Sequence, residues 1–455
     1  MLDEGKIKLT KDLKPVRTRR IKPVYNASKY KLKLRSNWFQ KYLVLIILAA
    51  LLILCLGFLK SDLYQVLKIG LGLRNKNILV GFQNSAELRP TGGFWGSFGI
   101  WKISNNPLSS ELLFETNPYK NDNKLLLTNT EPLPEPMRLV FGQKPQSFVN
   151  ANWATDFPTA AKDIEWYLSQ GWGQKVDGTI AVSSLAMIDM LNLTGPLELS
   201  DHTLVNSENF TQVMSEKIDT EYWQDPSNLI INEPKTILKE LSPELIKHAK
   251  SLGYLKLYKF LLQEMHRGRI LAYFSQDSLE KASEKLNISA EAKPYNIDYL
   301  SVNNSNIGGD KSSLNVNQSM KYSVDTSRAK SEGRLSITRQ MNENWPHKTN
   351  KNYMRIIAPL GSSLIWATID SEPAEVEATQ ENSRTCFGFW FSLDPGQTKT
   401  LDMKYSLPFE NIALRDYNLV YQKQPGTLPE YLEVKLNKKT IFNQSLDESD
   451  KKIRM

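Results

Sequence analysis

The sequence predicts an α/β domain followed by an all-β, immunoglobulin-like sandwich, both carried on one N-terminal transmembrane helix. Three observations predict this arrangement. A long uncharged segment lies near the start of the chain, strand patterns then alternate with helix patterns up to about residue 310, and short runs of β-branched and aromatic residues follow. A chain of 455 residues has room for two or three such domains.

The uncharged segment runs for 18 residues from Tyr42 to Leu59. As a helix it would extend about 27 Å, close to the ~30 Å hydrocarbon core of a bilayer. Residues 1–36 carry eight Lys and four Arg against three acidic residues, and such a basic flank stays cytoplasmic. That flank is too long for the alternative, a cleaved signal peptide. We predict a cytoplasmic tail at 1–37 and a single plasma-membrane span at 38–60, with the bulk of the chain extracytoplasmic.

Charge and cysteine content narrow the possible partners and the compartment. The formal net charge is +8, but the basic tail accounts for all of it and the rest of the chain is near neutral. This distribution argues against nucleic acid and leaves the lipid bilayer as the expected partner of the tail. Cys55 lies in the predicted span and Cys386 is alone outside it, so the exterior part has no intrachain disulfide. A disulfide-poor exterior is typical of a bacterial envelope protein.

The first half of the α/β domain, which we place at 75–310, contains three predicted strands. They cover residues 77–83, 94–104 and 111–116. Residues 117–150 are rich in Asn and Pro and show no periodicity, which predicts a long loop that is either functional or disordered.

The second half alternates helices and strands. A helix is predicted at 155–172, where Asp156 or Thr155 can cap its first turn, and a second helix at 183–195, opened by a Ser and closed by a Gly. A strand at 175–182 separates them. Short strand character returns at 196–199, and the segment from Ser207 to Leu286 is predicted to be mainly helical.

The last part of the chain is predicted to be a sandwich at 311–440, followed by a polar tail at 441–455. Eight short runs between residues 319 and 437 are rich in β-branched and aromatic residues, and turn sequences such as Asp394-Pro395-Gly396 separate several of them. The polar stretch SVNNSNIGGDKSS, residues 301–313, predicts the boundary between the two domains.

The stretch ELRPTGGFWGSFG, residues 87–99, has three possible interpretations. In the structural one, Pro90 and the two following glycines make a tight turn and Glu87 pairs with Arg89 at its rim. The residues alone favour this interpretation. In the aromatic one, Phe94, Trp95 and Phe98 form a platform for a sugar or a lipid.

In the functional interpretation, the turn of Thr91, Gly92 and Gly93 presents backbone N–H groups to an anion, with Arg89 beside them. Such a site would favour a phosphate or a pyrophosphate, and Glu87 could help to hold a divalent cation. The glycine spacing matches neither a dinucleotide-binding nor a P-loop pattern.

Other charged residues are weaker candidates. Arg267 and Arg269 could contact phosphate, but a basic run at a helix end more often faces water. Asp177 could belong to a site or could simply precede a turn. Asp310 and Lys311 could form a wall of a site or a linker turn.

The stretch ILVGFQNSAELRPTGGFWGSFG resembles the signature of a bacterial family known as domain of unknown function 4012. The resemblance continues through VDGTIAVSSLAMIDMLNLTGPLEL, NNSNIGGDKSS, YMRIIAPLGSSL and YQKQPGT, in that order, over most of residues 75–430. It implies a single-pass envelope protein and no particular activity.

The order of predicted elements in residues 156–199 is also similar to that of the LytR–CpsA–Psr phosphotransferases. Those proteins have a helix, a strand with an Asp, and a helix that ends in a Gly-containing turn. This resemblance implies transfer of a glycopolymer from a polyprenyl pyrophosphate carrier to the cell wall, with Arg residues and Mg²⁺. On this resemblance, Glu87 and Arg89 lie in a first phosphate-contacting loop. Together with the residue patterns described above, it gives the following candidates. The catalytic candidates are Arg89, Glu87 and Asp177; the ligand-binding candidates are Arg89, Thr91, Gly92, Gly93, Arg267 and Arg269; the metal candidate is Glu87.

The sequence departs from that family where a Pro-Arg-Asp motif is expected. FETNPYKND, residues 114–122, has no Arg, and Lys lacks the bidentate fork of Arg. Two expectations therefore stand. The first is an envelope protein that handles or transfers a lipid-linked or cell-wall glycopolymer, and the alternative is a non-catalytic surface protein that binds or scaffolds.

Overall fold

The computed structural model describes residue 57 and residues 60–105, 110–115, 117–125, 129–293, 297–327, 330–410 and 416–454. The predicted tail at 1–37 lies outside these residues, as does the predicted span at 38–60 apart from Gly57 and Lys60. Within the described ranges no helix is both long and apolar enough to cross a membrane. The transmembrane helix therefore stays a prediction.

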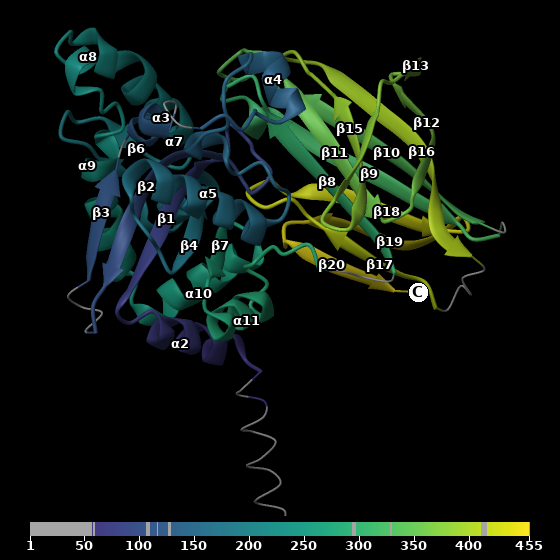
Figure 1. Ribbon diagram of the computed structural model, residues 1–455, viewed down its shortest axis with the longest axis horizontal. Coiled ribbons are helices and arrows are strands. Elements are labelled where there is room, and N and C mark those ends of the chain that lie inside the picture. The colour runs from purple at the N-terminus through teal and green to yellow at the C-terminus, as the bar shows by residue number, and fades with distance from the viewer. Residues whose placement is uncertain are drawn as a thin grey trace, which may run out of the picture. The chain divides into compact units, whose positions relative to one another are not determined.

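The α/β region is built on a five-stranded sheet with the strand order β3-β2-β1-β4-β7 (Figure 1). Its strands are β1 (Lys76–Asn84), β2 (Phe94–Ile103), β3 (Glu111–Glu115), β4 (Gly178–Ser183) and β7 (Ile270–Phe274). β1 and β4 are parallel, and the other pairs are antiparallel. The four strands predicted for this sheet are confirmed. β7 was missed, because it is a short strand inside a segment of helical pattern.

Two predicted helices are confirmed together with their caps. These are α5 (Phe157–Trp172) and α6 (Ser184–Thr194). The Asp156 carboxylate accepts a hydrogen bond from the N–H of Thr159 at 2.9 Å, and the Ser183 hydroxyl accepts one from the N–H of Leu185 at 3.1 Å. Buried residues of α5 join a core cluster with residues of β1 and β2.

The remaining helices flank the sheet or lie in the connections. They are α2 (Asp62–Gly72), α3 (Tyr119–Leu125), α4 (Glu135–Phe141), α7 (Phe210–Ser215), α8 (Asn228–Ile231), α9 (Ile237–Ser251), α10 (Tyr254–His266) and α11 (Asp277–Lys285), with short turns at Phe148–Asn150, Glu216–Thr220 and Glu221–Gln224 and a small hairpin of β5 (Leu197–Glu198) and β6 (Leu204–Val205). The prediction of a structureless loop at 117–150 is wrong, since this segment contains α3 and α4. Buried apolar residues such as Met137 and Phe148 anchor it despite its polar composition.

The C-terminal region is β-rich and consists of two sheets with a common core. The seven-stranded sheet has the order β13-β12-β16-β10-β9-β18-β19 and the six-stranded sheet the order β14-β15-β11-β8-β17-β20. Their strands are β8 (Asp298–Asn306), β9 (Val316–Asp325), β10 (Lys330–Met341), β11 (Asn352–Pro359), β12 (Ser363–Ile369), β13 (Glu372–Pro373), β14 (Glu377–Glu381), β15 (Arg384–Trp390), β16 (Thr398–Glu410), β17 (Asn418–Gln422), β18 (Glu430–Leu436), β19 (Lys439–Leu446) and β20 (Asp450–Arg454).

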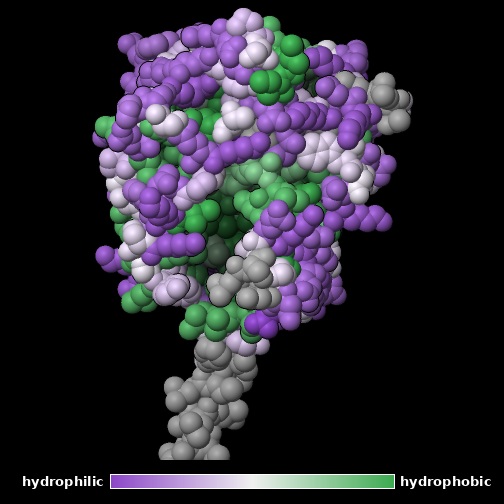
Figure 2. All heavy atoms as spheres, turned by 90° about the vertical axis from the view of Figure 1, so that its left-hand side faces the viewer, coloured by the Kyte–Doolittle hydropathy of each residue, from purple (hydrophilic) through white to green (hydrophobic). Residues whose placement is uncertain are grey.

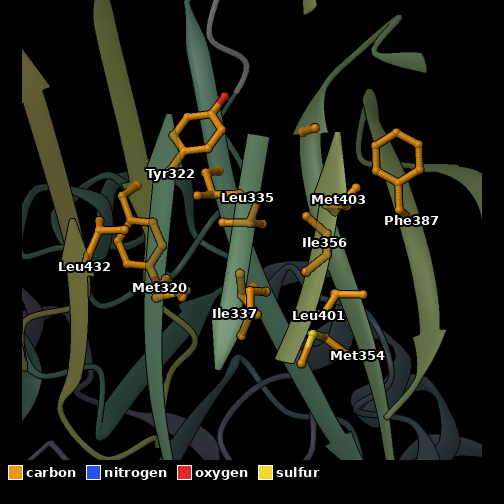
Figure 3. Packing of buried hydrophobic residues seen from close by; sticks show 14 of the residues in the cluster. Met320, Tyr322, Leu335, Ile337, Met354, Ile356, Phe387, Leu401, Met403 and Leu432 are labelled. Carbon is orange, nitrogen blue, oxygen red and sulfur yellow. Dashed lines mark hydrogen bonds between the residues drawn. The ribbon is translucent and has the colours of Figure 1, made fainter. Parts of the chain in front are cut away.

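Side chains from both sheets fill one apolar cluster (Figure 3). Met320 and Leu335 come from the larger sheet, whereas Met354, Ile356 and Phe387 come from the smaller one. The alternation of buried and exposed residues along β10 places one face of the larger sheet in this core.

Two sequence predictions about this region are wrong. The polar stretch at 301–313, predicted to be the boundary, begins inside β8, whose nine residues are all buried. Its asparagines donate side-chain hydrogen bonds, for example from Asn304 Nδ2 to Gln318 Oε1 at 3.0 Å. The predicted tail at 441–455 holds the end of β19 and all of β20, where Ile453 is buried.

Candidate functional site

The loop at 85–93 lies in the contact between the α/β region and the sandwich. Four of its backbone carbonyls accept hydrogen bonds from sandwich residues. The carbonyls of Ala86, Leu88, Arg89 and Pro90 accept from Ser313 N, Asn306 N, Gln424 Nε2 and Asn303 Nδ2 at 2.9, 2.9, 3.0 and 3.1 Å. Three of the stretches that carry the family resemblance, far apart in sequence, therefore meet at this buried contact.

Arg89 is enclosed in this contact. Its side chain is 1% exposed, and its Nη2 lies 3.0 Å from Glu87 Oε1. Its Nη1 donates to the carbonyls of Leu88 and Asn306. The predicted pairing of Glu87 with Arg89 is confirmed, although it lies in the interior and not at a rim. A guanidinium held in this way has no face open to a phosphate, so the structure gives Arg89 a structural position.

The turn that follows is also used internally. The N–H groups of Gly92 and Phe94 donate to the carbonyls of Arg89 and Glu87 at 2.9 and 2.8 Å, and Thr91 Oγ1 accepts from Gln83 Nε2 at 2.9 Å. Gly92 has a φ of +120°, and a Cβ there would lie 2.8 Å from Gln83 Oε1. The glycine is thus required by the backbone conformation and by close packing, and the N–H groups of Gly92 and Phe94 are already paired within the turn.

The aromatic interpretation fails for two of its three residues. Trp95 and Phe98 are 0% and 1% exposed and belong to the core beneath α5. Phe94 alone borders an open space, the pocket described below.

Asp177 lies at the opposite end of the sheet from Glu87. The parallel register pairs Ile78 with Gly178 and Gln83 with Ser183, so Asp177 precedes one end of these strands and Glu87 follows the other. Five residues of strand separate the ends by about 17 Å. The Asp177 carboxylate accepts from Asn77 N at 2.9 Å and lies 3.1 Å from Lys76 Nζ. The predicted catalytic set of Arg89, Glu87 and Asp177 is therefore not brought together.

Arg267 and Arg269 form a network of ion pairs with three carboxylates. Arg267 lies 2.7 Å from both Asp189 and Asp447, and Arg269 lies 3.3 Å from Asp447. Glu264 completes the network, and burial raises its pKa to about 7. Because Asp447 belongs to the C-terminal region, this network is a second link across the contact. The predicted phosphate-binding role is not supported, since carboxylates already occupy both guanidinium groups.

A pocket of about 460 Å³ lies beside the sheet, beneath α7 and α9. Figure 2 shows an opening lined by hydrophobic residues on this side of the molecule. Phe82 and Val182 pair across β1 and β4, and the ring of Phe82 lies 5.4 Å from that of Phe114. The apolar lining comes from Phe82, Phe94, Phe114, Val182, Met187, Phe210, Met214, Ile218, Trp223, Pro234, Leu238, Leu241 and Leu245.

Lys235 supplies a positive charge at the polar part of this pocket. Its ammonium group donates to the Gly96 carbonyl and lies 5.7 Å from the centre of the Phe94 ring. A Cβ on Gly96 would lie 3.0 Å from this Nζ, so the glycine leaves room for it. Burial lowers the pKa of Lys235 to about 8. Among the residues that the structure describes, no carboxylate forms an ion pair with Lys235.

The other charged groups of the pocket are already paired. Lys311 donates to Ser215 Oγ at 3.1 Å and to the Asp219 carboxylate. Burial raises the pKa of Glu87, whereas the nearby Arg89, Lys311 and Lys235 act to lower it. With Glu87 bound to Arg89 and Asp219 bound to Lys311, Lys235 is the remaining cation of the described pocket lining that can attract an anion.

The predicted divalent cation does not fit these residues. The Glu87 carboxylate faces the Arg89 guanidinium and has lysines as neighbours, which is an unfavourable setting for a second cation. Across the described ranges, no group of three His, Cys, Asp or Glu side chains is placed to hold a metal ion.

Comparison with known proteins assigns the first part of the α/β region. Residues 74–218 match the sequence model of a family described as protein of unknown function (DUF4012). These residues are a DUF4012 segment. The resemblance predicted from the sequence is thereby confirmed over this range. No curated protein sequence matches the chain.

The chain is distantly similar to parts of several solved structures. A proposed nutrient-binding protein of Legionella pneumophila is 10% identical over 27% of this chain and 51% of its own, with a TM-score of 0.20. An M1 zinc metallopeptidase of Deinococcus radiodurans is 13% identical over 28% of this chain and 33% of its own, with a TM-score of 0.18. Yeast LTA4 hydrolase in complex with bestatin is 7% identical over 26% of this chain and 23% of its own, with a TM-score of 0.16. The chain covers about half or less of each of them, and these TM-scores are too low to indicate a shared fold.

The DUF4012 segment supplies only part of the pocket. It includes the sheet strands β1 to β4 and α7, whereas Lys235, α9 and Lys311 lie beyond residue 218. Sequence reasoning recognised Lys311 as a possible wall of a site but missed Lys235. The available signal was weak, because Lys235 is one lysine after a proline in a segment with no motif.

Proposed function

We propose that this protein is a membrane-anchored, extracytoplasmic envelope protein that binds a lipid-linked molecule in the pocket beneath α7 and α9. The observation that carries the proposal is an apolar pocket of about 460 Å³ lined by the half-buried Lys235, whose ammonium group has no carboxylate partner among the described residues. The predicted span and basic tail supply the anchor.

The apolar lining favours a hydrocarbon chain as the bound group. The pocket volume lies within the range of ligand sites in proteins, roughly 300–1,000 Å³. Each CH₂ group removed from water contributes about 0.8 kcal/mol. A branched polyprenyl chain is rich in such groups and would contact the side chains of α7 and α9 without needing hydrogen bonds from them.

The ammonium group of Lys235 favours an anionic head group on that chain. At a pKa of about 8 it is mostly protonated at neutral pH. A phosphate placed beside it would form a charge-assisted hydrogen bond in a place shielded from water, where such bonds are strong. A polyprenyl phosphate or pyrophosphate, free or carrying a glycan, combines both features.

Binding without transfer is the favoured form of this function. Transfer from a pyrophosphate requires several fixed positive charges around the reacting atoms. The arginines predicted for that role are paired with carboxylates, and Asp177 is at the far end of the sheet. We retain the LytR–CpsA–Psr-like class of the α/β region and the immunoglobulin-like class of the sandwich as parts of the proposal; a mixed sheet and two packed β-sheets support them.

The test compares two probes, decaprenyl phosphate and the uncharged decaprenol, bound to the detergent-solubilised full-length protein. We expect Lys235→Met to weaken binding of the phosphate at least 10-fold and of the alcohol less than 2-fold. Leu245→Trp, which fills the pocket, should weaken both. Lys239→Met is the matched control, because Lys239 lies only four residues further along the chain, in α9, but outside the pocket lining, and pairs with Glu233 at 3.3 Å. Equal loss for both probes with Lys235→Met, or no binding by the wild type, would overturn the proposal.

A further inference from the structure

We propose that α2 is a membrane-docking helix whose exposed leucines rest on the lipid bilayer. Leu63, Leu67 and Leu71 are 43%, 48% and 60% exposed. The inference rests on the membrane anchor of the proposed function and is independent of what the pocket binds.

The three leucines form one stripe along the helix. They are spaced by four residues, and this spacing places side chains on the same face one turn apart. The opposite face is already occupied, since Val66, Ile69 and the following Leu73 pack into a cluster with Leu279 of α11. α2 is therefore apolar on two faces, whereas a helix on the surface of a soluble domain normally turns polar residues outward.

The position of α2 in the chain identifies the bilayer as the occupant of this stripe. The helix begins at Asp62, only two residues after Lys60, where the predicted span ends. Two residues reach at most about 7 Å, and interfacial helices bury their apolar face roughly 5–10 Å into the head-group boundary. A second protein could reach the leucines only by fitting between α2 and the bilayer, in a space of about 7 Å.

Charges around the stripe complement an anionic lipid surface. Lys60 and Arg74 are exposed just before and just after α2, and Lys68 lies between them. Asp62 is the acidic residue of the first turn, and it lies 3.4 Å from His266 of α10. Each basic residue near such a surface contributes about 1 kcal/mol. Figure 1 places α2 at the lower end of the α/β region, and Figure 2 shows hydrophobic atoms at the lower end of the face that it displays.

The test measures whether this stripe contacts lipid. The full chain is reconstituted in nanodiscs of phosphatidylcholine and phosphatidylglycerol, and an environment-sensitive NBD dye is attached at Leu67→Cys in a Cys55→Ser background. Cys386 can stay, because it is buried and its thiol pKa is raised to about 11. The matched control is Ile230→Cys on α8, an apolar position that is 89% exposed and distant in sequence.

We expect blue-shifted emission at position 67 that doxyl-labelled lipid quenches at least 3-fold more than emission at position 230. Equal quenching at the two positions, in protein that enters the nanodiscs, would overturn the docking and leave the anchor intact. A blue shift at position 67 without lipid quenching would identify a second copy of the chain as the occupant and would also overturn it. Failure of the chain to enter nanodiscs would overturn the anchor and the docking together.

Discussion

At the scale of single residues, burial determines what the charged side chains can do. Arg89 has the residue type and the neighbours of a phosphate ligand in the sequence, yet it is enclosed against Glu87 and the Asn306 carbonyl. Lys235 has no motif around it, yet it borders the pocket and, unlike Lys311, forms no ion pair with a described carboxylate. Sequence patterns report residue type and spacing, whereas exposure depends on segments that are more than 100 residues away.

The buried Arg89 predicts a large stability effect. Replacing Arg89 with Met leaves the Glu87 carboxylate without its partner, and loss of one member of a buried ion pair costs about 3–5 kcal/mol. We expect that decrease in the free energy of unfolding, measured by urea denaturation of the full-length protein. Lys247→Met is the control, since Lys247 is 73% exposed and its pair with Glu244 should contribute less than about 1 kcal/mol. Similar losses in both variants would contradict the structural role of Arg89.

Asp298 predicts a pH dependence of stability. It is buried in the sandwich, accepts hydrogen bonds from Tyr417 and Tyr322 at 2.6 and 2.9 Å, and has its pKa raised from 3.8 to about 6 by burial. A raised carboxyl pKa gives stability that is present below about pH 4 and is lost as pH rises through 6. The wild type should therefore lose up to about 3 kcal/mol relative to Asp298→Asn between pH 4 and pH 7. The wild type and Asp298→Asn share all other buried carboxyl groups, so the contributions of these groups cancel in the difference in stability. A difference that does not change with pH would refute the assignment of the pH dependence to Asp298.

At the scale of secondary structure elements, local signals predicted well where a cap or an alternation was present. α5 and α6 were predicted from their capping residues, and β1 and β2 from their patterns. Prediction failed where polar residues are buried through side-chain hydrogen bonds, as in β8, because composition then resembles that of a loop. It also failed for the pocket, which is formed when α7 and α9 cover one face of the sheet.

The cap of α5 gives a quantitative test at this scale. Asp156 accepts hydrogen bonds from the N–H groups of Thr159 and Ala292 at 2.9 and 2.7 Å. We expect Asp156→Ala to lower the thermodynamic stability by about 1–2 kcal/mol, the upper part of the range for an N-cap. Asp156→Asn keeps one acceptor oxygen, so its stability should lie between that of the wild type and that of Asp156→Ala. If Asn and Ala were equally destabilising in denaturant titrations, the hydrogen bonds would not be the cause.

At the scale of the whole molecule, the α/β region and the sandwich share one buried contact. The loop at 86–90 and the network of Arg267, Arg269 and Asp447 both cross it, and residues 58–455 cluster as one unit. We expect both regions to unfold together. Hydrogen exchange in increasing urea should remove the protection of β1 and of β10 at the same concentration, and two well-separated midpoints would show that the contact is weak.

The central claim is that the pocket beneath α7 and α9, and not the loop at 87–93, binds a lipid-linked anion. The most direct test is photolabelling of the full-length protein with a polyprenyl phosphate that carries a diazirine on its chain, followed by peptide mass spectrometry. We predict adducts on peptides that contain 210–215 and 237–251, reduced by Leu245→Trp. Adducts on those peptides no more abundant than on the exposed α8, or unaffected by Leu245→Trp, would contradict the claim.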